Sequence, residues 1–366
     1  MGAITSRIVG LLVLAGIVLG LVRGLGTQRP PKDGATLNTG FTFSERQAGY
    51  LDVSWQQAFH AAMDLQPDVV RLGAYWDTIE PKPGQYDFTT LDWLLDNTAP
   101  QSSVLLTVGM KAPRWPEYYL PGWLRRQVQA PQGSDVAESA TVRAAALQYV
   151  KAVVQHEKGR TNIKYWQVEN EPLDPSGPRQ WTIDAGFLSE EVALVRSLDP
   201  TRPIVLNMFV DTSPLGYWPP ARKAMIDRAQ RLVNLADVVG LDVYPVRPMS
   251  SAGVNLSLTW PAWEWQGRLR TLQAMGSKAG KPVWISEAQA EPWVPAKLVA
   301  SAGGNTSPGL TTSTVDSLQA AGFNTILLWG VEYWYQQSQQ DDGSWWSHMM
   351  RFFNQATPME GTPPSA

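Results

Sequence analysis

The stretch Ile163-Lys164-Tyr165-Trp166-Gln167-Val168-Glu169-Asn170-Glu171-Pro172 decides the predicted fold. It begins as an apolar run typical of a buried strand and ends in a polar group closed by a proline. Charged side chains are rarely buried without a partner, so a carboxylate at the tip of an apolar strand needs a reason. Parallel barrels place functional side chains at this end of their strands. Taken alone, Glu171 is equally well read as a solvated loop glutamate.

A second apolar run, from Pro282 to Ser286, also leads into a glutamate, Glu287. The two glutamates are far apart in the sequence, so only the fold can bring them together, and a closed barrel of parallel strands does so. Paired carboxyl groups are what glycoside hydrolysis requires. One protonates the departing oxygen, and the other attacks the sugar or activates water.

The composition narrows the chemistry further. The chain has 366 residues, 44% of them apolar, and a net charge of −3 without long runs of one sign. A single barrel domain can have this length. The charge distribution contains no basic cluster of the kind that binds nucleic acid. There are no cysteines, and the three histidines have no metal-ligand spacing, so we expect no metal and no cofactor. Of the 17 tryptophans, most should be core and some should be stacking platforms.

The N-terminus carries an export signal. Residues 8–22 are apolar between Arg7 and Arg23, short for a membrane span and within the range of a signal-peptide core. We expect a signal anchor or signal peptide over 1–26, a flexible linker over 27–39 and a disordered tail over 357–366. The protein is then exported, either secreted or anchored at the cell surface, with the membrane as a partner if the segment is not cleaved. The sequence leaves the oligomeric state open.

Between these ends, apolar runs alternate with helical patterns, which is typical of repeated βα units. Eight strands are predicted, at 41–43, 69–72, 104–108, 163–168, 204–208, 238–244, 283–286 and 325–329. Helices are predicted after Ser54 and over 138–156, 187–197, 222–235 and 310–321, with a tryptophan-rich loop around 260–265 that merges into a helix ending near Gly276. The pattern predicts an α/β fold, a single (β/α)₈ TIM barrel over residues 40–356.

The motif Asn170-Glu171-Pro172 resembles the clan-A glycoside hydrolases, a (β/α)₈ group that includes families 5 and 42. The resemblance covers nearly all of the predicted barrel. It implies that Glu171 is the acid/base, that Asn170 binds the sugar 2-hydroxyl and that Glu287 is the nucleophile. It also implies a carbohydrate substrate.

The segment from Arg71 to Asp92 resembles the second-strand region of the same clan. The resemblance implies that Arg71 and Tyr244 hydrogen-bond the nucleophile and that Trp329 floors the sugar subsite. Trp115 and Trp293 are further candidate platforms. The loops that hold them look more like a poorly characterised bacterial branch than like a well-known family, and this leaves the substrate open.

The chemistry sets requirements on the two glutamates. A retaining mechanism needs carboxyl groups about 5–5.5 Å apart, an acid kept protonated by burial or a like charge, and an ionised nucleophile. We therefore expect a retaining glycoside hydrolase acting on β-linked oligo- or polysaccharides. Two alternatives stay open: a non-catalytic carbohydrate-binding surface protein on the same scaffold, and a transglycosidase that uses the same residues.

Other charged residues near the predicted strand ends compete for these roles. Glu291 is a weaker candidate nucleophile, because it lies in a loop beyond the strand. Glu169 has a smaller chance of touching substrate, and Glu80 is expected to be structural. Lys111 and Arg114 are read equally well as ligands of a sugar or as members of structural ion pairs.

Overall fold

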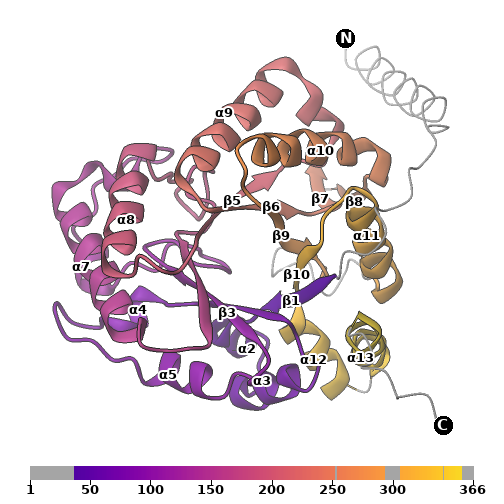
Figure 1. Cartoon of the computed structure of the whole chain (residues 1–366), viewed down its shortest axis with the longest axis horizontal. Helices are drawn as coiled ribbons and strands as arrows, with labels where there is room; N and C mark the ends of the chain where they lie inside the picture. The colour runs from indigo at the N-terminus through magenta and orange to yellow at the C-terminus, as the bar shows by residue number, and fades with distance from the viewer. Residues whose placement is uncertain (1–36, 252–253, 293–305, 341, 357–366) are drawn as a thin grey trace, which may run out of the picture.

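The computed structural model describes residues 37–251, 254–292, 306–340 and 342–356, which form a closed barrel of eight parallel strands in the order β1-β10-β9-β6-β5-β4-β3-β2. Figure 1 shows the strands at the centre of a ring of helices. The barrel strands are β1 (Asn38–Thr42), β2 (Val69–Gly73), β3 (Ser103–Val108), β4 (Ile163–Val168), β5 (Ile204–Val210), β6 (Val238–Val243), β9 (Val283–Gln289) and β10 (Thr325–Trp329). The predicted TIM barrel is confirmed.

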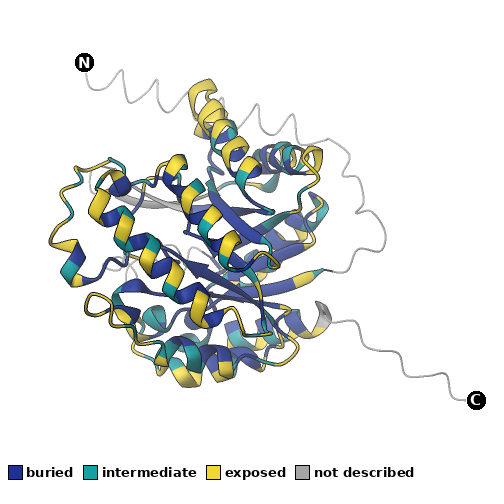
Figure 2. Ribbon diagram, turned by 60° about the vertical axis from the view of Figure 1, so that its left-hand side comes forward, coloured by how far each residue is buried: buried dark blue, intermediate teal, exposed yellow. Residues whose placement is uncertain are grey.

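The helices cover the outside of the barrel, with their apolar sides turned to the strands (Figure 2). The long ones start at side-chain caps where the sequence offers them: Ser54, Ser139 and Asp184 each accept a bond from a backbone amide of the first turn. The helices are α2 (Glu45–Tyr50), α3 (Trp55–Met63), α4 (Trp76–Ile79), α5 (Thr89–Asp96), α6 (Gly122–Arg125), α7 (Ala140–Glu157), α8 (Ala185–Leu198), α9 (Pro219–Leu235), α10 (Ala262–Lys278), α11 (Pro308–Ala320), α12 (Val331–Gln339) and α13 (Ser344–Ala356), with 3₁₀ turns η1 (Val136–Glu138) and η2 (Pro214–Tyr217).

The interior of the barrel has an apolar layer and a polar layer. The apolar layer is a separate cluster inside the strands, made of Val69, Leu105, Val205, Val238 and Leu327, with Tyr165 and Trp284 packed against it. Two residues further along a strand, the side chain points to the same face of the sheet. The polar residues Arg71, Gln167 and Asn207 therefore follow Val69, Tyr165 and Val205 on the inner face, closer to the carboxyl ends of the strands.

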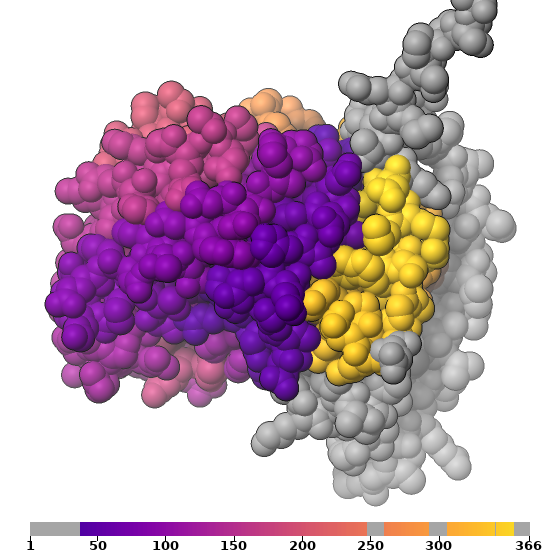
Figure 3. Space-filling view, turned by 90° about the horizontal axis from the view of Figure 1, so that it is seen from below, coloured from indigo at the N-terminus to yellow at the C-terminus, as the bar shows by residue number. Residues whose placement is uncertain are grey.

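The first and last strands close the barrel. β1 pairs in parallel with β10, from Asn38 with Thr325 to Thr42 with Trp329. Helix α13 packs over the same seam, where Phe353 meets Phe41 edge to face. Figure 3 shows the last described residues, in yellow, beside the first described residues, in indigo, on one face of the molecule.

Several predicted strand and helix bounds are wrong. β1 begins at Asn38, three residues before the strand predicted at 41–43. A two-stranded antiparallel sheet, β7 (Val246–Ser251) with β8 (Val254–Thr259), follows β6 and was not predicted. Trp263 and Trp265 lie in α10, not in a loop, because Pro261 in an extended conformation starts the helix directly before them.

Strand β9 continues to Gln289, three residues beyond its predicted end. Its last residues are polar or small, but Ala288 and Gln289 pair with Leu328 and Trp329 of β10. Two terminal stretches lie outside the described residues, 1–36 and 357–366. The first includes the predicted export segment and most of the predicted linker. Among the described residues, no helix has the length and apolar character to cross a membrane.

Candidate active site

Glu171 and Glu287 meet at the carboxyl ends of the barrel strands. One carboxylate oxygen from each, together with one from Asp242, lies within 4.8 Å of the others. Glu171 is in the turn after β4, and Glu287 is on β9, where the pairing with β6 shifts register between Leu241 and Asp242. Such an irregularity re-aims a side chain, and here Glu287 becomes the direct partner of Asp242.

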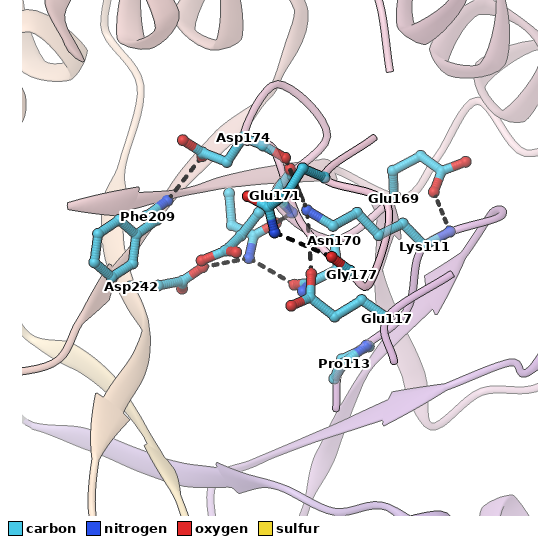
Figure 4. A network of polar contacts seen from close by, with 12 residues as sticks. Lys111, Pro113, Glu117, Glu169, Asn170, Glu171, Asp174, Gly177, Phe209 and Asp242 are labelled. Atoms are coloured by element: carbon cyan, nitrogen blue, oxygen red, sulfur yellow. Dashed lines mark hydrogen bonds and ion pairs between the residues drawn. The ribbon is translucent and has the colours of Figure 1, made fainter. Parts of the chain in front are cut away.

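The backbone after β4 is bent sharply to present Glu171. Glu169 and Glu171 have φ angles of 59° and 43°, in the left-handed region that costs a non-glycine residue about 1 kcal/mol or more. The turn is held from both sides: the amide of Glu171 donates to Asn207 Oδ1 over 2.8 Å, and Lys111 Nζ donates to the Glu171 carbonyl over 2.7 Å. Figure 4 shows Lys111 reaching into this turn.

Glu287 lies between a cation and a hydroxyl donor. Arg71 Nη1 donates to Oε1 over 2.5 Å, and the Tyr244 hydroxyl donates to Oε2. Both side chains are buried. These are the two contacts that the resemblance implied for the nucleophile.

Arg71 uses the rest of its guanidinium to join three strands. Its Nε donates to Gln167 Oε1 over 2.8 Å, and its Nη2 donates to Asn170 Oδ1 over 2.5 Å. The fork geometry of arginine allows these bonds to form together. β2, β4 and β9 are thus tied through one side chain that is fully buried.

Asn207, on β5, links the Asn170–Glu171 turn to β6. Its Nδ2 donates to Asn170 Oδ1 over 2.9 Å and to Asp242 Oδ2 over 2.6 Å. Its Oδ1 accepts from the amide of Glu171 and from Gln167 Nε2. Ser286 Oγ donates to the other Asp242 oxygen over 2.5 Å.

The sequence did not lead to a prediction for four residues of this site: Asn207, Asp242, Gln167 and Ser286. A signal was present for two of them. Asn207 is a polar residue inside the apolar run from 204 to 210, and Asp242 stands two residues before Tyr244 in a strand that is otherwise apolar. A polar side chain on the inner face of a barrel strand needs a partner, and this requirement indicates a shared polar layer.

Burial and neighbouring negative charge raise the pKa values of Glu171, Asp242 and Tyr244. The pKa of Glu171 is raised well above its ordinary value, first by burial, then by Asp242, and also by Glu287, against an opposing effect of Lys111. The pKa of Asp242 is raised to about 8 by burial and by Glu287. The pKa of Tyr244 is raised well above its ordinary value by burial and by the adjacent Glu287. A protonated Glu171 is what a general acid requires.

Glu169 lies beside the buried Glu191 and joins the end of β4 to the segment after β3. Its carboxylate accepts from the amides of Met110 and Lys111 over 2.8 and 2.5 Å. A Cβ at Gly109 would lie 2.3 Å from the Glu169 carboxyl carbon, so the close approach requires glycine there. Burial raises the pKa of Glu169 to about 7. Its role is structural.

Arg114 and Glu291 form a second charged group at the rim. Arg114 pairs with both Glu291 and the buried Glu332, and its guanidinium lies over the Trp329 ring, 4.0 Å from the centroid. Glu291 is therefore held by Arg114 rather than directed at Glu171. Glu80 accepts from the Trp76 indole and the Gly84 amide, which is the structural role expected for it.

Two of the three predicted aromatic platforms lie in the described residues. Trp329 is half-buried and meets Tyr244 edge to face, with centroids 6.3 Å apart. Trp115 is 69% exposed, so its ring is available to a ligand. Trp293 lies outside the described residues.

The three converging carboxyl groups are the set in this region that would suit a hard cation. Both oxygens of Glu287 already accept hydrogen bonds, from Arg71 and Tyr244, and both oxygens of Asp242 accept from Asn207 and Ser286. The guanidinium supplies the positive charge that an ion would bring. The donor set therefore fits a hydrogen-bonded acid/base centre better than a metal centre.

The chain resembles known glycoside hydrolases in part of its sequence and in its fold. The family 42 glycoside hydrolase profile, described as β-galactosidase, matches residues 50–177, the part of the chain that contains Arg71, Asn170 and Glu171. The chain contains a domain like that of the family 42 β-galactosidases. The predicted resemblance to the clan-A glycoside hydrolases is confirmed. The comparison with curated proteins found no match.

Solved structures of the same clan share the fold. A family 42 β-galactosidase from G. stearothermophilus superposes with a TM-score of 0.63 at 13% identity over 90% of this chain and 58% of its own. The β-galactosidase of Halorubrum lacusprofundi gives 0.53 at 16% identity, over 80% and 52%. Xylanase 10B from Thermotoga petrophila gives 0.52 at 16% identity, over 81% and 82%. The chain thus spans little more than half the length of these β-galactosidases and most of the xylanase.

Proposed function

We propose that this protein is a retaining glycoside hydrolase that cleaves β-linked oligo- or polysaccharides, with Glu171 as acid/base and Glu287 as nucleophile. The observation that carries the proposal is the approach of the two carboxyl groups, whose nearest oxygens lie within 4.8 Å. An inverting enzyme needs room for a water between them, about 6.5–9.5 Å. The short gap favours direct attack on the sugar.

The surroundings of the two glutamates suit opposite tasks. Glu287 accepts bonds from Arg71 and Tyr244 and keeps a carboxylate available for attack. Glu171, half-buried beside Asp242 and Glu287, keeps a proton to give away because burial and these negative neighbours raise its pKa. Two carboxyl groups in such different environments are typical of an acid and a nucleophile in one site.

The proposed reaction has two steps, and Glu171, Glu287 and water account for every bond and proton in both. In the first, Glu287 attacks the anomeric carbon while Glu171 protonates the glycosidic oxygen, the bond to the leaving group breaks, and a glycosyl ester forms. In the second, the ionised Glu171 takes a proton from water, the water oxygen attacks the same carbon, and the ester breaks. Esterification removes the charge of Glu287, which makes ionisation of Glu171 easier and lets it serve as the base.

An exposed aromatic segment supports an extended substrate. Leu215, Tyr217 and Trp218 follow β5, and the exposed Trp263 is in the first turn of α10. Arg268 holds this segment by donating to the carbonyls of residues 211–213 and by lying 4.4 Å from the Tyr217 ring centroid. β5 is the neighbour of β4, so the segment lies on the side of Glu171, where the leaving group departs.

The same exchange of bonds serves a transglycosidase, in which a sugar hydroxyl replaces water in the second step. The non-catalytic scaffold has less support, because a protein that only binds sugar has no need of a protonated carboxyl directed at an ionised one. We also propose that the protein is exported, on the basis of the apolar segment 8–22. Fractionation of cells that produce the full chain tests this, and recovery of the protein solely in the cytoplasm contradicts it.

The first experiment is mass spectrometry of the intact protein after exposure to a panel of activated 2-fluoro glycosides. Fluorine destabilises the transition state for release, so the glycosyl-enzyme accumulates. A mass gain that maps to Glu287, and that is absent in Glu287→Gln, supports retaining catalysis and reports the preferred sugar. Glycan binding without labelling or turnover would favour the non-catalytic scaffold instead.

A further inference from the structure

A third carboxyl group shares the site, and the proposed mechanism above leaves it without a task. The Asp242 side chain is fully buried on β6. One of its oxygens lies within 4.8 Å of both Glu171 and Glu287. We call Glu171, Asp242 and Glu287 the carboxyl triad.

Asp242 is held firmly by its neighbours on both sides. Asn207, from β5, donates to Oδ2, and Ser286, from β9, donates to Oδ1. The same Asn207 Nδ2 also donates to Asn170 Oδ1, and Asn207 Oδ1 accepts from the Glu171 amide. The position of Asp242 is therefore coupled, through one side chain, to the backbone that presents Glu171.

Among the described residues, Arg71 and Lys111 are the cations that contact the triad, fewer than its three carboxyl groups. Arg71, from β2, is bonded to Glu287. Lys111, at the end of β3, donates to the Glu171 carbonyl and pairs with Glu117 at 3.3 Å. The remaining groups on the strands beside Asp242 are neutral: Asn207, Ser286 and the Tyr244 hydroxyl. Like charges this close cannot all ionise in a buried site, so the triad must retain at least one proton near neutral pH.

We propose that Asp242 is a positioning residue for Glu171, which holds the acid carboxyl against β6 and retains a proton on it until substrate takes that proton. The Glu171 and Asp242 carboxyl groups each place an oxygen within 4.8 Å of the other. While Asp242 is ionised, its negative charge favours a proton on Glu171. The proposal rests on the proposed function for its kinetic consequence, but not for the shared proton itself.

The kinetic test compares Asp242→Asn with the wild type. Asparagine keeps the shape and can bond both Asn207 and Ser286, but carries no charge. Without the negative neighbour, Glu171 should lose its proton at lower pH. The alkaline limb of kcat/KM for a glycoside with a poor leaving group should then move to lower pH by about one unit. Ser286→Ala, which removes a bond to Asp242 and no charge, is the control and should leave the limb in place.

A second measurement needs no turnover. A carboxyl group whose pKa is raised by folding contributes stability below its ordinary pKa and loses it as the pH rises through the folded value, here about 8 for Asp242. From pH 5 to pH 9 the wild type should therefore lose stability relative to Asp242→Asn, by roughly 8–16 °C in the difference between their melting temperatures. Ser286→Ala should show a constant difference from the wild type.

The outcomes separate the two proposals. A pH-dependent stability difference without any glycosidase activity overturns the proposed function and supports the proton on the triad. A constant difference, or an alkaline limb that does not move, overturns the role of Asp242. If calcium chloride stabilises the wild type but not Asp242→Asn, the triad is a cation site and the proposal fails. Asp242→Ser carries the same expectations if the asparagine variant does not fold.

Discussion

The two layers inside the barrel use the same strands for opposite purposes. Val69, Tyr165 and Val205 belong to the apolar layer, and Arg71, Gln167 and Asn207, two residues further along, belong to the polar layer. The pleat and the parallel pairing are common to both. Side-chain chemistry alone distinguishes the layer that excludes water from the layer that handles protons.

The two layers are also stabilised differently. The apolar layer gains free energy from area removed from water, about 25 cal/mol for each Å². The polar layer costs free energy unless each buried group finds a partner. Here Arg71, on β2, and Asn207, on β5, donate to acceptors on or next to β4, β6 and β9, so the cost is distributed over one connected network. Substitutions in the two layers should therefore have distinct signatures.

The largest effect on activity is expected for Glu287→Gln in the polar layer. The amide keeps bonds to Arg71 and Tyr244 but cannot attack carbon, so kcat should fall by roughly 10⁴–10⁶-fold while the fold remains. Steady-state kinetics with circular dichroism check this. A variant that keeps a tenth of wild-type activity would identify a different nucleophile, and Glu291→Gln is the matched comparison.

A smaller loss is expected for Glu171→Ala. Removing the acid should lower kcat by about 10²–10⁴-fold for substrates with poor leaving groups, and less for activated aryl glycosides. Because the pKa of Glu171 is raised, the wild-type rate should hold at neutral pH and fall as the pH rises through that pKa. This alkaline fall should be absent in the variant. Azide should restore turnover of activated substrates and yield a glycosyl azide of retained configuration.

The apolar layer should show the reverse signature. Leu105→Ala removes a fully buried side chain and should destabilise the fold by about 2–5 kcal/mol. The kcat of the folded fraction should stay near the wild-type value, because Leu105 touches the apolar cluster and not the carboxyl triad. Urea denaturation and kinetics at low temperature separate the two quantities. A loss of kcat without a loss of stability would contradict the division into layers.

The smallest effect is expected at the rim, beyond both layers. Trp218→Ala should weaken kcat/KM by about 3–10-fold for oligosaccharides, through the loss of one stacking surface. Hydrolysis of a small aryl glycoside should be unchanged. Tyr50→Ala, an exposed aromatic residue on α2, is the control. Equal effects on long and short substrates would argue against a binding role for Trp218.

The strands were predictable because the apolar runs are regularly spaced and each is bounded by polar or turn residues. The partners of Glu287 were predicted only through the resemblance to the clan-A glycoside hydrolases. Nothing in the periodicity identifies Arg71 or Tyr244 as its neighbours. The residues that were missed, Asn207 and Asp242, make contacts that depend on which strands are adjacent in space. Local sequence does not contain that information.

The missed elements have physical reasons of their own. Pro248 within the run Val246–Ser251 argues against a strand, because proline cannot donate to a ladder, yet β7 is an edge strand, where it is tolerated. The helix α10 was predicted, but the tryptophans at 260–265 obscured its start, which follows directly on Pro261. The end of β9 was underestimated because pairing with β10 overrides the weak strand preference of its last residues.

The pairing of β1 with β10 has a consequence for the order in which the barrel and its site are assembled. Asn38 and Thr325, paired across it, are separated by 287 residues, nearly the whole length of the barrel sequence. Contacts between such distant residues make folding slow, because a long loop must close before they contribute. Glu287 is delivered by β9, the strand next to the last. A nascent chain emerging from the ribosome has therefore made Arg71, Asn170 and Asn207 long before it makes the carboxylate that they are arranged around, and the polar network is complete only after β9 has been made.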